Sequence, residues 1–465
     1  MAAEARGAAG AVGSAAVAAV AVGNPAVTIG SAVDALETPA LVVDADALER
    51  NIARLADWTR ARGLRLRPHA KTHKSAAIAR LQMAAGAVGV CVQKLSEAQA
   101  LADAGIDDLY ISNEIVDPAK LQRVAALAGR VRLALAVDSA LGAERLAQAL
   151  RSAGTMLDVF VEIDVGHGRC GVAAEQGAAL ARRVASLGLR LAGLQAYQGR
   201  AQHLRSESER RAAIAEAVSR VRRVQGEMAA AGLPCPLVTG AGTGTFPLEA
   251  ESGVYGELQA GSYVFMDVDY ASNESGAGGP RFEHALFLKS QVISRRPGQA
   301  VVDAGHKSHA IESGLPRVWL ADARADAAGT ATADGHPTGR FAAIDFVNGG
   351  DEHGLLRAAA TPPQGRGSGS PPGVHGAASV GEAALAGMSG ATGKRAAAEA
   401  SGARSDLGPA DADDGLPALG ETVWLVPGHC DPTVNLHDAL IVVRGGLQRG
   451  IVEAIWPVDA RGCLR

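Results

Sequence analysis

Short apolar runs alternate with amphipathic segments between about residues 64 and 265 of this 465-residue chain. The apolar runs have the length and β-branched character of strands, and the segments between them carry apolar residues at intervals of three and four, as helices do. We predict eight strands here: Leu64–Pro68, Ala87–Gln93, Leu109–Asn113, Val131–Val137, Val159–Val165, Leu189–Tyr197, Pro236–Gly240 and Glu257–Phe265. The predicted helices between them include Ser96–Ala104, Lys120–Leu127, Ala140–Ser152, Ala174–Leu187 and Ser206–Ala231.

Strands that alternate with helices pair in parallel, and eight such units favour a closed (β/α)8 barrel of the TIM type over an open, doubly wound sheet. We therefore assign residues 35–275 to an α/β barrel. In such barrels the reactive side chains lie at the C-terminal ends of the strands. Residues that directly follow a predicted strand thus become the first candidates for a functional site.

A different pattern begins near residue 280, where the helical period fades and short strand-like runs follow one another. These runs predict a second, C-terminal, β-rich domain made of residues 276–356 and 421–465. Its predicted strands are Ala285–Ile293, Gln299–Val302, Val318–Leu320, Phe341–Val347, Thr422–Pro427, Leu440–Arg444 and Ile451–Ile455.

Two segments lack the mixture of side chains that a packed core requires. Residues 1–34 are an Ala/Gly-rich stretch that we expect to be a mobile tail. Residues 357–420 are a low-complexity insertion that we expect to be disordered, because its composition cannot bury enough apolar surface to offset the entropy of ordering.

The overall composition, with 48% hydrophobic residues and a formal net charge of −4, is that of an ordinary soluble protein. It indicates neither nucleic-acid binding nor membrane association. Five cysteines, odd in number and widely spaced, argue against a disulfide framework and in favour of a reducing cytoplasm.

The segment 67–74, Arg-Pro-His-Ala-Lys-Thr-His-Lys, follows the first predicted barrel strand and places Lys71 among basic and aromatic groups. Neighbouring cations and partial desolvation disfavour an ammonium ion, so we expect a lowered pKa for Lys71 and an amine able to form a Schiff base. Taken alone, such a run is more often a basic surface turn. Lys71 is the first candidate for a covalent cofactor anchor, with Lys74 as its replacement.

Further candidates follow the later strands of the predicted barrel. Arg169 emerges from a glycine-rich turn after the fifth strand, Tyr197 ends the sixth, and His203 comes shortly after it. Two glycine-containing loops at the seventh and eighth strands suit a phosphate, because their backbone N–H groups and hydroxyls can donate to an anion. These loops contain Gly242, Thr243, Gly244 and Thr245, and Gly261, Ser262 and Tyr263. An amine, an arginine and a phosphate loop at one barrel mouth together predict a pyridoxal 5′-phosphate site.

A possible metal site stands at the end of a strand of the second domain. His429 and Asp431 are two residues apart, so on an extended segment both project to the same side, with Cys430 on the other. One imidazole and one carboxylate leave a sparse site that suits Mn²⁺ or Mg²⁺ better than a closed zinc cage. The alternative is a polar loop in which both side chains satisfy backbone groups.

Several motifs together resemble a known family. They are TPALVVD at 38–44, RPHAKTHK at 67–74, VEIDVG and GRCGV between 161 and 172, QAYQG at 195–199, LQAGSY at 258–263 and PGHCDPT at 427–433. They resemble the D-threonine aldolase family, whose members include 3-hydroxy-D-aspartate aldolase and D-serine dehydratase and are alanine-racemase-like, fold-type III pyridoxal phosphate enzymes. The resemblance covers residues 36–356 and 421–462 and leaves out the tail and the insertion.

The resemblance implies a Schiff-base role for Lys71 and contact of Arg169 with the pyridine nitrogen of the cofactor. It implies that Tyr197 and the two glycine-containing loops cradle the cofactor. His203 would sit near the substrate hydroxyl as a base, and the protein would form a homodimer.

The activity that the resemblance implies is the cleavage of a D-3-hydroxy amino acid, such as D-threonine, to glycine and an aldehyde, with a divalent metal on His429 and Asp431. A D-serine-type dehydratase is the alternative, and a non-catalytic pyridoxal phosphate-binding protein is a more remote one. In the dehydratases the second ligand is a cysteine two residues after the histidine, so Asp431 favours the aldolases. Three further residues are His306, Lys307 and His309. They could bind the second carboxylate of a substrate such as 3-hydroxyaspartate, or they could simply be exposed.

Overall fold

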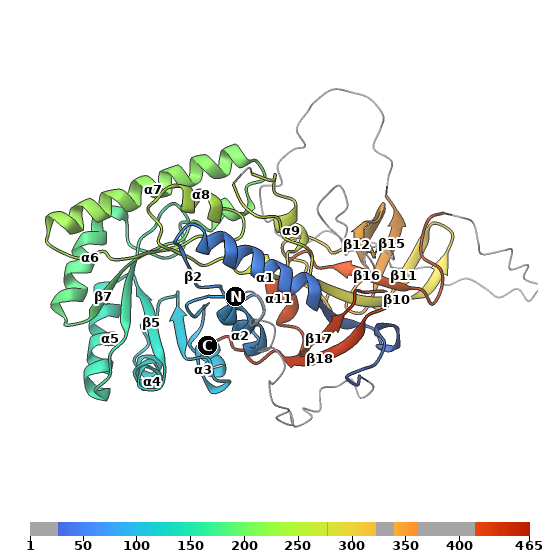
Figure 1. Cartoon of the computed structure of the whole chain (residues 1–465), viewed down its shortest axis with the longest axis horizontal. Helices are drawn as coiled ribbons and strands as arrows, with labels where there is room; N and C mark the ends of the chain where they lie inside the picture. Colours follow the sequence, from blue (N-terminus) through green and yellow to red (C-terminus); the bar gives the residue numbers. More distant parts are fainter. Residues whose placement is uncertain (1–26, 277, 322–338, 360–413) are drawn as a thin grey trace, which may run out of the picture.

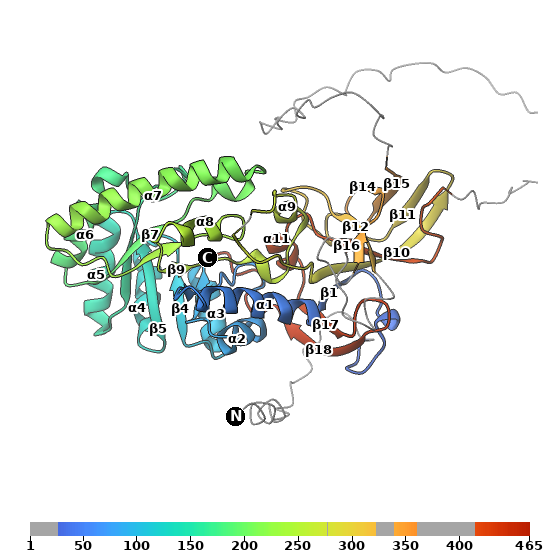
Figure 2. The ribbon, with the colours of Figure 1, turned by 45° about the horizontal axis from the view of Figure 1, so that its top comes forward.

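The computed structural model describes residues 27–276, 278–321, 339–359 and 414–465. The chain folds into two units that lie side by side, a barrel on the left of Figure 1 and a β-rich domain on the right. The short helix α11 (Cys430–Val434) lies between them in both ribbon views (Figures 1 and 2). The long helix α1 (Ala45–Arg60) leads from the β-rich domain into the barrel.

The barrel has eight parallel strands, as the alternating pattern predicts. Their order is β2-β9-β8-β7-β6-β5-β4-β3. The ring closes between its first and last strands, because the Val88 N–H donates to the Leu66 carbonyl (2.9 Å) and the Cys91 N–H to the Pro68 carbonyl (2.8 Å). The strands are β2 (Arg65–Leu66), β3 (Val90–Val92), β4 (Asp108–Ile111), β5 (Arg132–Val137), β6 (Asp158–Glu162), β7 (Arg190–Ala196), β8 (Val238–Gly240) and β9 (Glu257–Leu258).

Helices cover the outside of this barrel, and their starts are marked by capping side chains. Asp44 accepts a hydrogen bond from the Ala47 N–H at the start of α1, and Ser139 accepts one from the Gly142 N–H at the start of α5. The remaining helices are α2 (Ala76–Ala84), α3 (Leu95–Asp103), α4 (Pro118–Ala128), α5 (Ala140–Ala153), α6 (Ala174–Ser186), α7 (Glu207–Ala230), α8 (Phe246–Glu251) and α9 (Val268–Ala271), with 3₁₀ turns η1 (Val33–Ala35), η2 (Arg200–His203) and η3 (Ser262–Val264).

The β-rich domain is built around a mostly antiparallel sheet. Its main path runs β13-β12-β16-β10-β1-β17-β18, and β11, β14 and β15 extend it from β10. The strands are β1 (Ala40–Asp44), β10 (Leu286–Arg296), β11 (Gln299–Val302), β12 (Arg317–Ala321), β13 (Gly339–Phe341), β14 (Ile344–Asn348), β15 (Gly354–Ala358), β16 (Thr422–Val426), β17 (Ala439–Arg444) and β18 (Ile451–Pro457).

The structure corrects the boundary that assigned residues 35–275 to the barrel. Strand β1 lies in the β-rich domain, where it pairs with β10 in antiparallel and with β17 in parallel orientation. All five of its residues are buried, and its apolar side chains alternate between two hydrophobic clusters, with Leu41 and Val43 in one and Ala40 and Val42 in the other. The β-rich domain therefore contains both an early and a late part of the chain.

Two predicted strands are also wrong in extent. The predicted strand Phe341–Val347 is two strands, since β13 pairs with β12 whereas β14 pairs with β15, and the chain must turn between these partners. The eighth barrel strand ends at Leu258 rather than Phe265. There the backbone of Gly261 passes so close to the first barrel loop that an added Cβ would lie 2.7 Å from the Thr72 hydroxyl.

The two segments expected to be disordered lie mostly outside the described residues, but their inner ends are packed. Residues 27–34 belong to the fold, because the Gly30 N–H donates to the Val452 carbonyl (2.8 Å) and Val33 is buried. The insertion is shorter than 357–420, since its first residues complete β15 and Asp414 accepts a hydrogen bond from the Gly298 N–H (3.0 Å). The tail 1–26 and the stretch 360–413 are not described.

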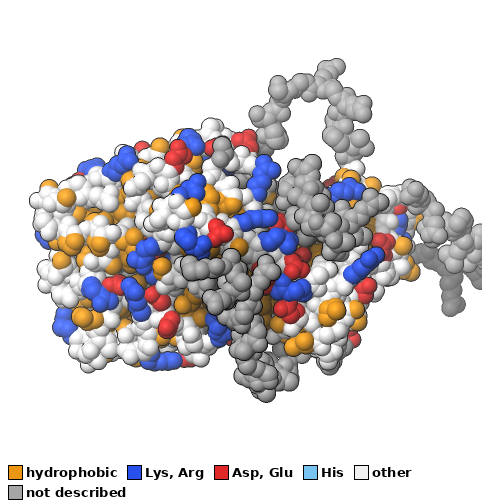
Figure 3. Space-filling model, viewed as in Figure 1, with side chains coloured by type: hydrophobic (Ala, Val, Ile, Leu, Met, Phe, Trp, Pro, Cys, Tyr) orange, Lys and Arg blue, Asp and Glu red, His pale blue; other side chains and the backbone are white. Residues whose placement is uncertain are grey.

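The surface and the cysteines agree with the composition. All five cysteines are free, as their number and spacing predict. On the face drawn in Figure 3, basic and acidic side chains are interspersed rather than gathered into a block of one sign. No helix in the described part of the chain has the length and apolar character needed to cross a bilayer.

A buried lysine anchors the first described residues to the β-rich domain. Lys289 on β10 is 2% exposed, and its ammonium donates to the carbonyls of Val33 (3.0 Å), Asp34 (2.9 Å) and Leu36 (2.7 Å). We expect Lys289→Met to lower the free energy of unfolding by about 3 kcal/mol, because it leaves buried carbonyls without a donor. Chemical denaturation measures the loss. Lys307→Met, at a side chain 59% exposed, is the control and should change stability by no more than about 0.5 kcal/mol. A loss below about 1 kcal/mol for Lys289→Met would contradict the anchor.

Candidate functional site

A cavity of about 260 Å³ opens at the C-terminal ends of the barrel strands and is closed on one side by the β-rich domain. This is the end at which the barrel rule places reactive side chains. The structure brings most of the predicted residues to this cavity. Those that line it are Lys71, Arg169, Tyr197, His203, Gly242, Thr243, Gly261, Ser262 and His429.

Lys71 and Asp431 form an ion pair across the boundary between the barrel and the β-rich domain. The distance from Lys71 Nζ to Asp431 Oδ2 is 3.0 Å, and the lysine side chain keeps 42% of its surface exposed toward the cavity. The nearby carboxylate of Asp431 raises the pKa of Lys71, although burial and Arg169 oppose the shift. The expectation of a lowered pKa is therefore wrong for this arrangement.

The two histidines beside Lys71 do not act as cations. Burial lowers the pKa of His69 to about 3 and that of His73 to about 4. His69 lies at the cavity, where its Nε2 contacts Gln93 (3.0 Å) and Ser112 (3.3 Å). Neutral imidazoles do not repel the lysine ammonium, which removes the main reason to expect a lowered pKa for Lys71.

Two loops at the cavity present unused hydrogen-bond donors. In the described part of the chain, no acceptor is found for the backbone N–H groups of Gly242, Thr243, Gly261 and Ser262. The hydroxyl of Thr243 accepts from the Tyr263 N–H (3.0 Å), which holds the two loops together. Converging, unpaired N–H groups in a partly buried cavity suit a phosphate.

Three other residues predicted for this cradle lie behind it. The Gly244 N–H donates to Gln202 Oε1 (3.0 Å), so it is already occupied. Thr245 is fully buried and donates its hydroxyl proton to Glu249 (2.8 Å). Tyr263 is also fully buried, and its hydroxyl accepts from Gln82 (3.1 Å). Their contacts support the loops from outside the cavity.

Arg169 and Tyr197 face the same cavity from the ends of β6 and β7. The charge of Arg169 acts to lower the pKa of Lys71 and that of Tyr197, but the Asp431 carboxylate outweighs it at the lysine and burial outweighs it at the tyrosine, so both pKa values are raised. The rings of Tyr197 and His167 pack edge to face, with their centroids 5.8 Å apart. Gly199 makes room for this imidazole, because an added Cβ would lie 2.4 Å from it.

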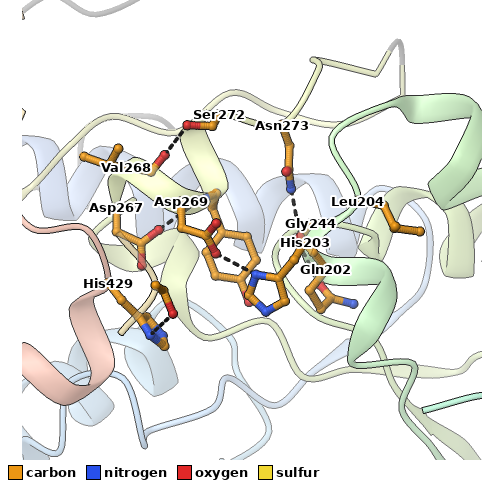
Figure 4. Close-up of polar contacts among 12 residues, drawn as sticks. Gln202, His203, Leu204, Gly244, Asp267, Val268, Asp269, Ser272, Asn273 and His429 are labelled. Carbon is orange, nitrogen blue, oxygen red and sulfur yellow. Dashed lines mark hydrogen bonds and ion pairs between the residues drawn. The ribbon is translucent and has the colours of Figure 1, made fainter. Parts of the chain in front are cut away.

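His203 is held by a carboxylate that the sequence pattern does not reveal. Its Nδ1 donates to Asp269 Oδ2 at 2.6 Å, as Figure 4 shows. Arg205 also pairs with the Asp269 carboxylate, and the pKa of Asp269 is lowered by His203 and Arg205 against the effect of burial. A carboxylate only accepts, so Nδ1 carries a proton, and the lone pair of the neutral imidazole lies on Nε2.

His429 has the same kind of support. Its Nδ1 contacts Glu312 Oε1 (2.8 Å) and the Ser313 hydroxyl (3.3 Å), and its Nε2 lies 3.8 Å from Asp431 Oδ1. An imidazole held by a carboxylate at one nitrogen and open at the other is the usual arrangement of a metal ligand. Beside Lys71, His429 and Asp431 thus bring together an imidazole and a carboxylate, which are both metal donors.

The segment that carries this pair is not extended, as the spacing argument assumed. His429 caps the N-terminus of α11, and Asp431 lies in the first turn of that helix. The two side chains nevertheless converge, because the backbone bends at the cap. Cys430 is fully buried and points away, as expected, and its N–H donates to Asp267 Oδ2 (3.1 Å).

The group suggested for a second carboxylate does not line the cavity. His306 pairs with Asp351 (2.9 Å), and Lys307 pairs with Asp351 (3.3 Å) and Glu352 (2.8 Å). His309 is buried, with its ring edge against Phe346 at 5.1 Å. The interaction partners of these side chains thus lie in the β-rich domain itself.

Most of the chain matches two family models in succession. Residues 43–269 match the N-terminal domain of alanine racemase, and residues 285–373 with 386–443 match a serine dehydratase domain. These matches divide the chain at the boundary between the barrel and the following β-rich residues.

Curated relatives and solved structures match over nearly the full length. A D-threonine aldolase from an Arthrobacter species is 37% identical over 92% of this chain and 94% of its own length. A 3-hydroxy-D-aspartate aldolase from Paracoccus denitrificans is 35% identical over 92% of both chains. The crystal structure of D-threonine aldolase from Filomicrobium marinum superposes with a TM-score of 0.76 at 40% identity, covering 94% of this chain and all of that one. A cysteine-to-alanine variant of D-threo-3-hydroxyaspartate dehydratase, described as metal-free, gives 0.68 at 26% identity over 92% and 98% of the two chains.

Lys71 is the one lysine that lines the cavity in the described part of the chain, so it should be the site at which an added aldehyde is captured. We expect wild-type protein incubated with pyridoxal 5′-phosphate and borohydride to carry the reduced adduct on Lys71, and Lys71→Ala to carry none. Peptide mass spectrometry locates the adduct. Lys307→Ala, at an exposed lysine, should behave as wild type, and an adduct on Lys74 would contradict the assignment.

Proposed function

Since this chain belongs to the family of D-threonine aldolase and 3-hydroxy-D-aspartate aldolase, we propose that it is a lyase that cleaves D-3-hydroxy amino acids to glycine and an aldehyde. The observation that carries the proposal is the 3.0 Å contact between Lys71 and Asp431. It brings a candidate cofactor anchor on the barrel and a candidate metal ligand on the β-rich domain to one point. A retro-aldol cleavage can use both a bound cofactor and a bound metal ion.

The residues at the cavity fit pyridoxal 5′-phosphate. The unpaired N–H groups of the two loops would bind its phosphate. Lys71 would hold the aldehyde carbon, and Arg169 would contact the ring nitrogen. An arginine there keeps the ring nitrogen unprotonated, which weakens the cofactor as an electron sink. Other groups must therefore help to stabilise the charge that develops during cleavage.

The cofactor would supply delocalisation of the electron pair released at Cα, and the metal would supply Lewis acidity at the substrate oxygen. The rest falls to side chains of this chain. His203 Nε2 would accept the proton of the 3-hydroxyl, because the bond to Asp269 keeps a ring proton on Nδ1. Asp269 also stabilises the imidazolium that forms when His203 takes this proton. Both steps occur at the rim between barrel and β-rich domain.

His429 and Asp431 would hold the divalent cation. A single imidazole and a single carboxylate leave open positions for water and for the substrate oxygens, which suits Mn²⁺ or Mg²⁺ better than Zn²⁺. Glu312 orients His429 for this purpose. The carboxylate at position 431 is also what favours cleavage over the dehydration catalysed by relatives.

The side chain of the preferred substrate stays open between D-threonine and 3-hydroxy-D-aspartate. The relatives include enzymes named for both. We also propose a homodimer in a reducing cytoplasm, supported by the family and by five free cysteines. A small amino acid, rather than a macromolecule, fits a cavity of about 260 Å³.

The decisive test is the release of glycine from D-threonine by the loaded protein. We expect Asp431→Ala to lose at least about 100-fold in kcat while retaining bound cofactor, since the cofactor contacts belong to the barrel. Chelation should reproduce the loss, and Mn²⁺ should restore the chelated wild type but not the variant. Asp351→Ala, at a carboxylate 59% exposed, is the matched control. Turnover that survives both treatments would refute the metal-assisted mechanism, and ammonia with a 2-oxo acid in place of glycine would identify a dehydratase.

A second test concerns the base. Asp269→Asn keeps the shape of the side chain, but its amide can donate to His203 Nδ1 and so move the ring proton to Nε2, where the base needs its lone pair. We expect kcat to fall about 100-fold with bound cofactor and Mn²⁺ affinity unchanged. Steady-state kinetics and cofactor absorbance separate the two effects. Equal kcat in Asp269→Asn and in the control Asp351→Asn would remove His203 from this role.

A further inference from the structure

Lys74, three residues beyond Lys71, lies outside the cavity and is almost fully buried, at 7% exposure. Its ammonium donates to Asn435 Oδ1 (2.8 Å) and pairs with Glu97 Oε1 (3.2 Å). Its backbone has a φ of 50°, a region that non-glycine residues seldom adopt. A strained backbone and a buried charge at one residue both cost free energy, so other interactions must hold this geometry.

The partners of Lys74 connect three parts of the molecule. Asn435 directly follows α11, the helix whose first turn carries Asp431. Glu97 lies in the first turn of α3 and uses its second oxygen to accept from the backbone N–H groups at positions 93 (2.8 Å) and 94 (3.0 Å). One ammonium group thus joins the loop of Lys71 to the barrel scaffold and to the segment that carries Asp431.

The C-terminal segment reinforces the same junction. The Ala460 N–H donates to the Lys74 carbonyl (3.0 Å), and the Gly462 N–H donates to Asn435 Oδ1 (3.2 Å). Asp459 accepts from the Ala76 N–H at the start of α2 (2.7 Å). The loop 71–75 is therefore held from the side opposite the cavity by groups of the β-rich domain.

We propose that Lys74 is a positioning residue, which fixes the separation between Lys71 and the metal pair His429 and Asp431 through its bond to Asn435. The inference rests on the proposed function for the roles of these three residues. Its physical basis is that Lys71 and Asp431 come from different domains, so their distance is set by whatever fastens the two loops. In the described structure Lys74 is the side chain that reaches from one loop to the other without entering the cavity.

The experiment compares Asn435→Ala, Asn435→Asp and the control Asn348→Ala, an asparagine of the β-rich domain that contacts His306 at 3.4 Å and does not line the cavity. Asn435 is partly exposed, so its loss should leave the fold intact. The readouts are the dissociation constant of Mn²⁺ from the cofactor-loaded protein and the rate at which the absorbance of lysine-bound cofactor appears. We expect Asn435→Ala to weaken Mn²⁺ binding and to slow this rate, each about tenfold, and Asn435→Asp to keep both within about twofold because it retains the acceptor.

Lys74→Met completes the test if it folds. It should weaken both readouts at least as much as Asn435→Ala does, and the double variant should lose less than the sum of the two single effects, because each single variant already removes the contact between Lys74 and Asn435. Values for Asn435→Ala within twofold of Asn348→Ala would overturn the inference and leave Lys74 a purely structural residue. Neither readout depends on glycine release, so a wild type that binds Mn²⁺ and cofactor yet makes no glycine refutes the proposed function alone. A wild type that binds neither overturns both.

Discussion

The ion pair between Lys71 and Asp431 imposes the constraint on which the rest of the structure depends, because its two members come from different domains. The barrel supplies Lys71, the two glycine-containing loops and His203, whereas the β-rich domain supplies His429 and Asp431. Neither domain contains the site by itself. The chain crosses between the domains early, through β1 and α1, and late, when its C-terminal residues return to the barrel, where the Arg465 carbonyl accepts from the Ser96 N–H (2.9 Å). These crossings join the two domains that carry the halves of the site.

The barrel could be predicted from the sequence because each strand and its following helix form a local unit with its own periodicity. The boundaries of the β-rich domain could not, because its pairings are non-local. Strand β1 reads as the first strand of a barrel, and only its burial between β10 and β17 assigns it to the other sheet. The same reason splits the predicted strand Phe341–Val347, whose two halves pair with different neighbours. The local sequence pattern predicts a strand, whereas pairing with residues distant in the sequence decides which sheet that strand joins.

The candidate site was predictable to the same extent. The rule that chemistry gathers at strand ends finds Lys71, Arg169 and Tyr197 on the cavity. It gives the wrong direction for the pKa of Lys71, because Asp431 is remote in sequence and its charge outweighs the local neighbours. It also misses Asp269, which lies in the four-residue helix α9, and Glu312, which lies in a turn, because segments this short show no periodicity. Supporting residues of this kind are defined by what they touch, so a sequence pattern carries no signal for them.

His203 and His429 are each held by a carboxylate, but their other neighbours suit them to different proposed roles. His203 and His429 each give Nδ1 to a carboxylate and keep Nε2 for the cavity. A second carboxylate, Asp431, stands 3.8 Å from Nε2 of His429, and an imidazole beside an anionic oxygen forms a donor set for a cation. His203 has no such neighbour on its Nε2 side among the described residues, so its lone pair is left for a proton. The proposed division between base and metal ligand therefore follows from the placement of one carboxylate, and that placement follows from the bend at the start of α11.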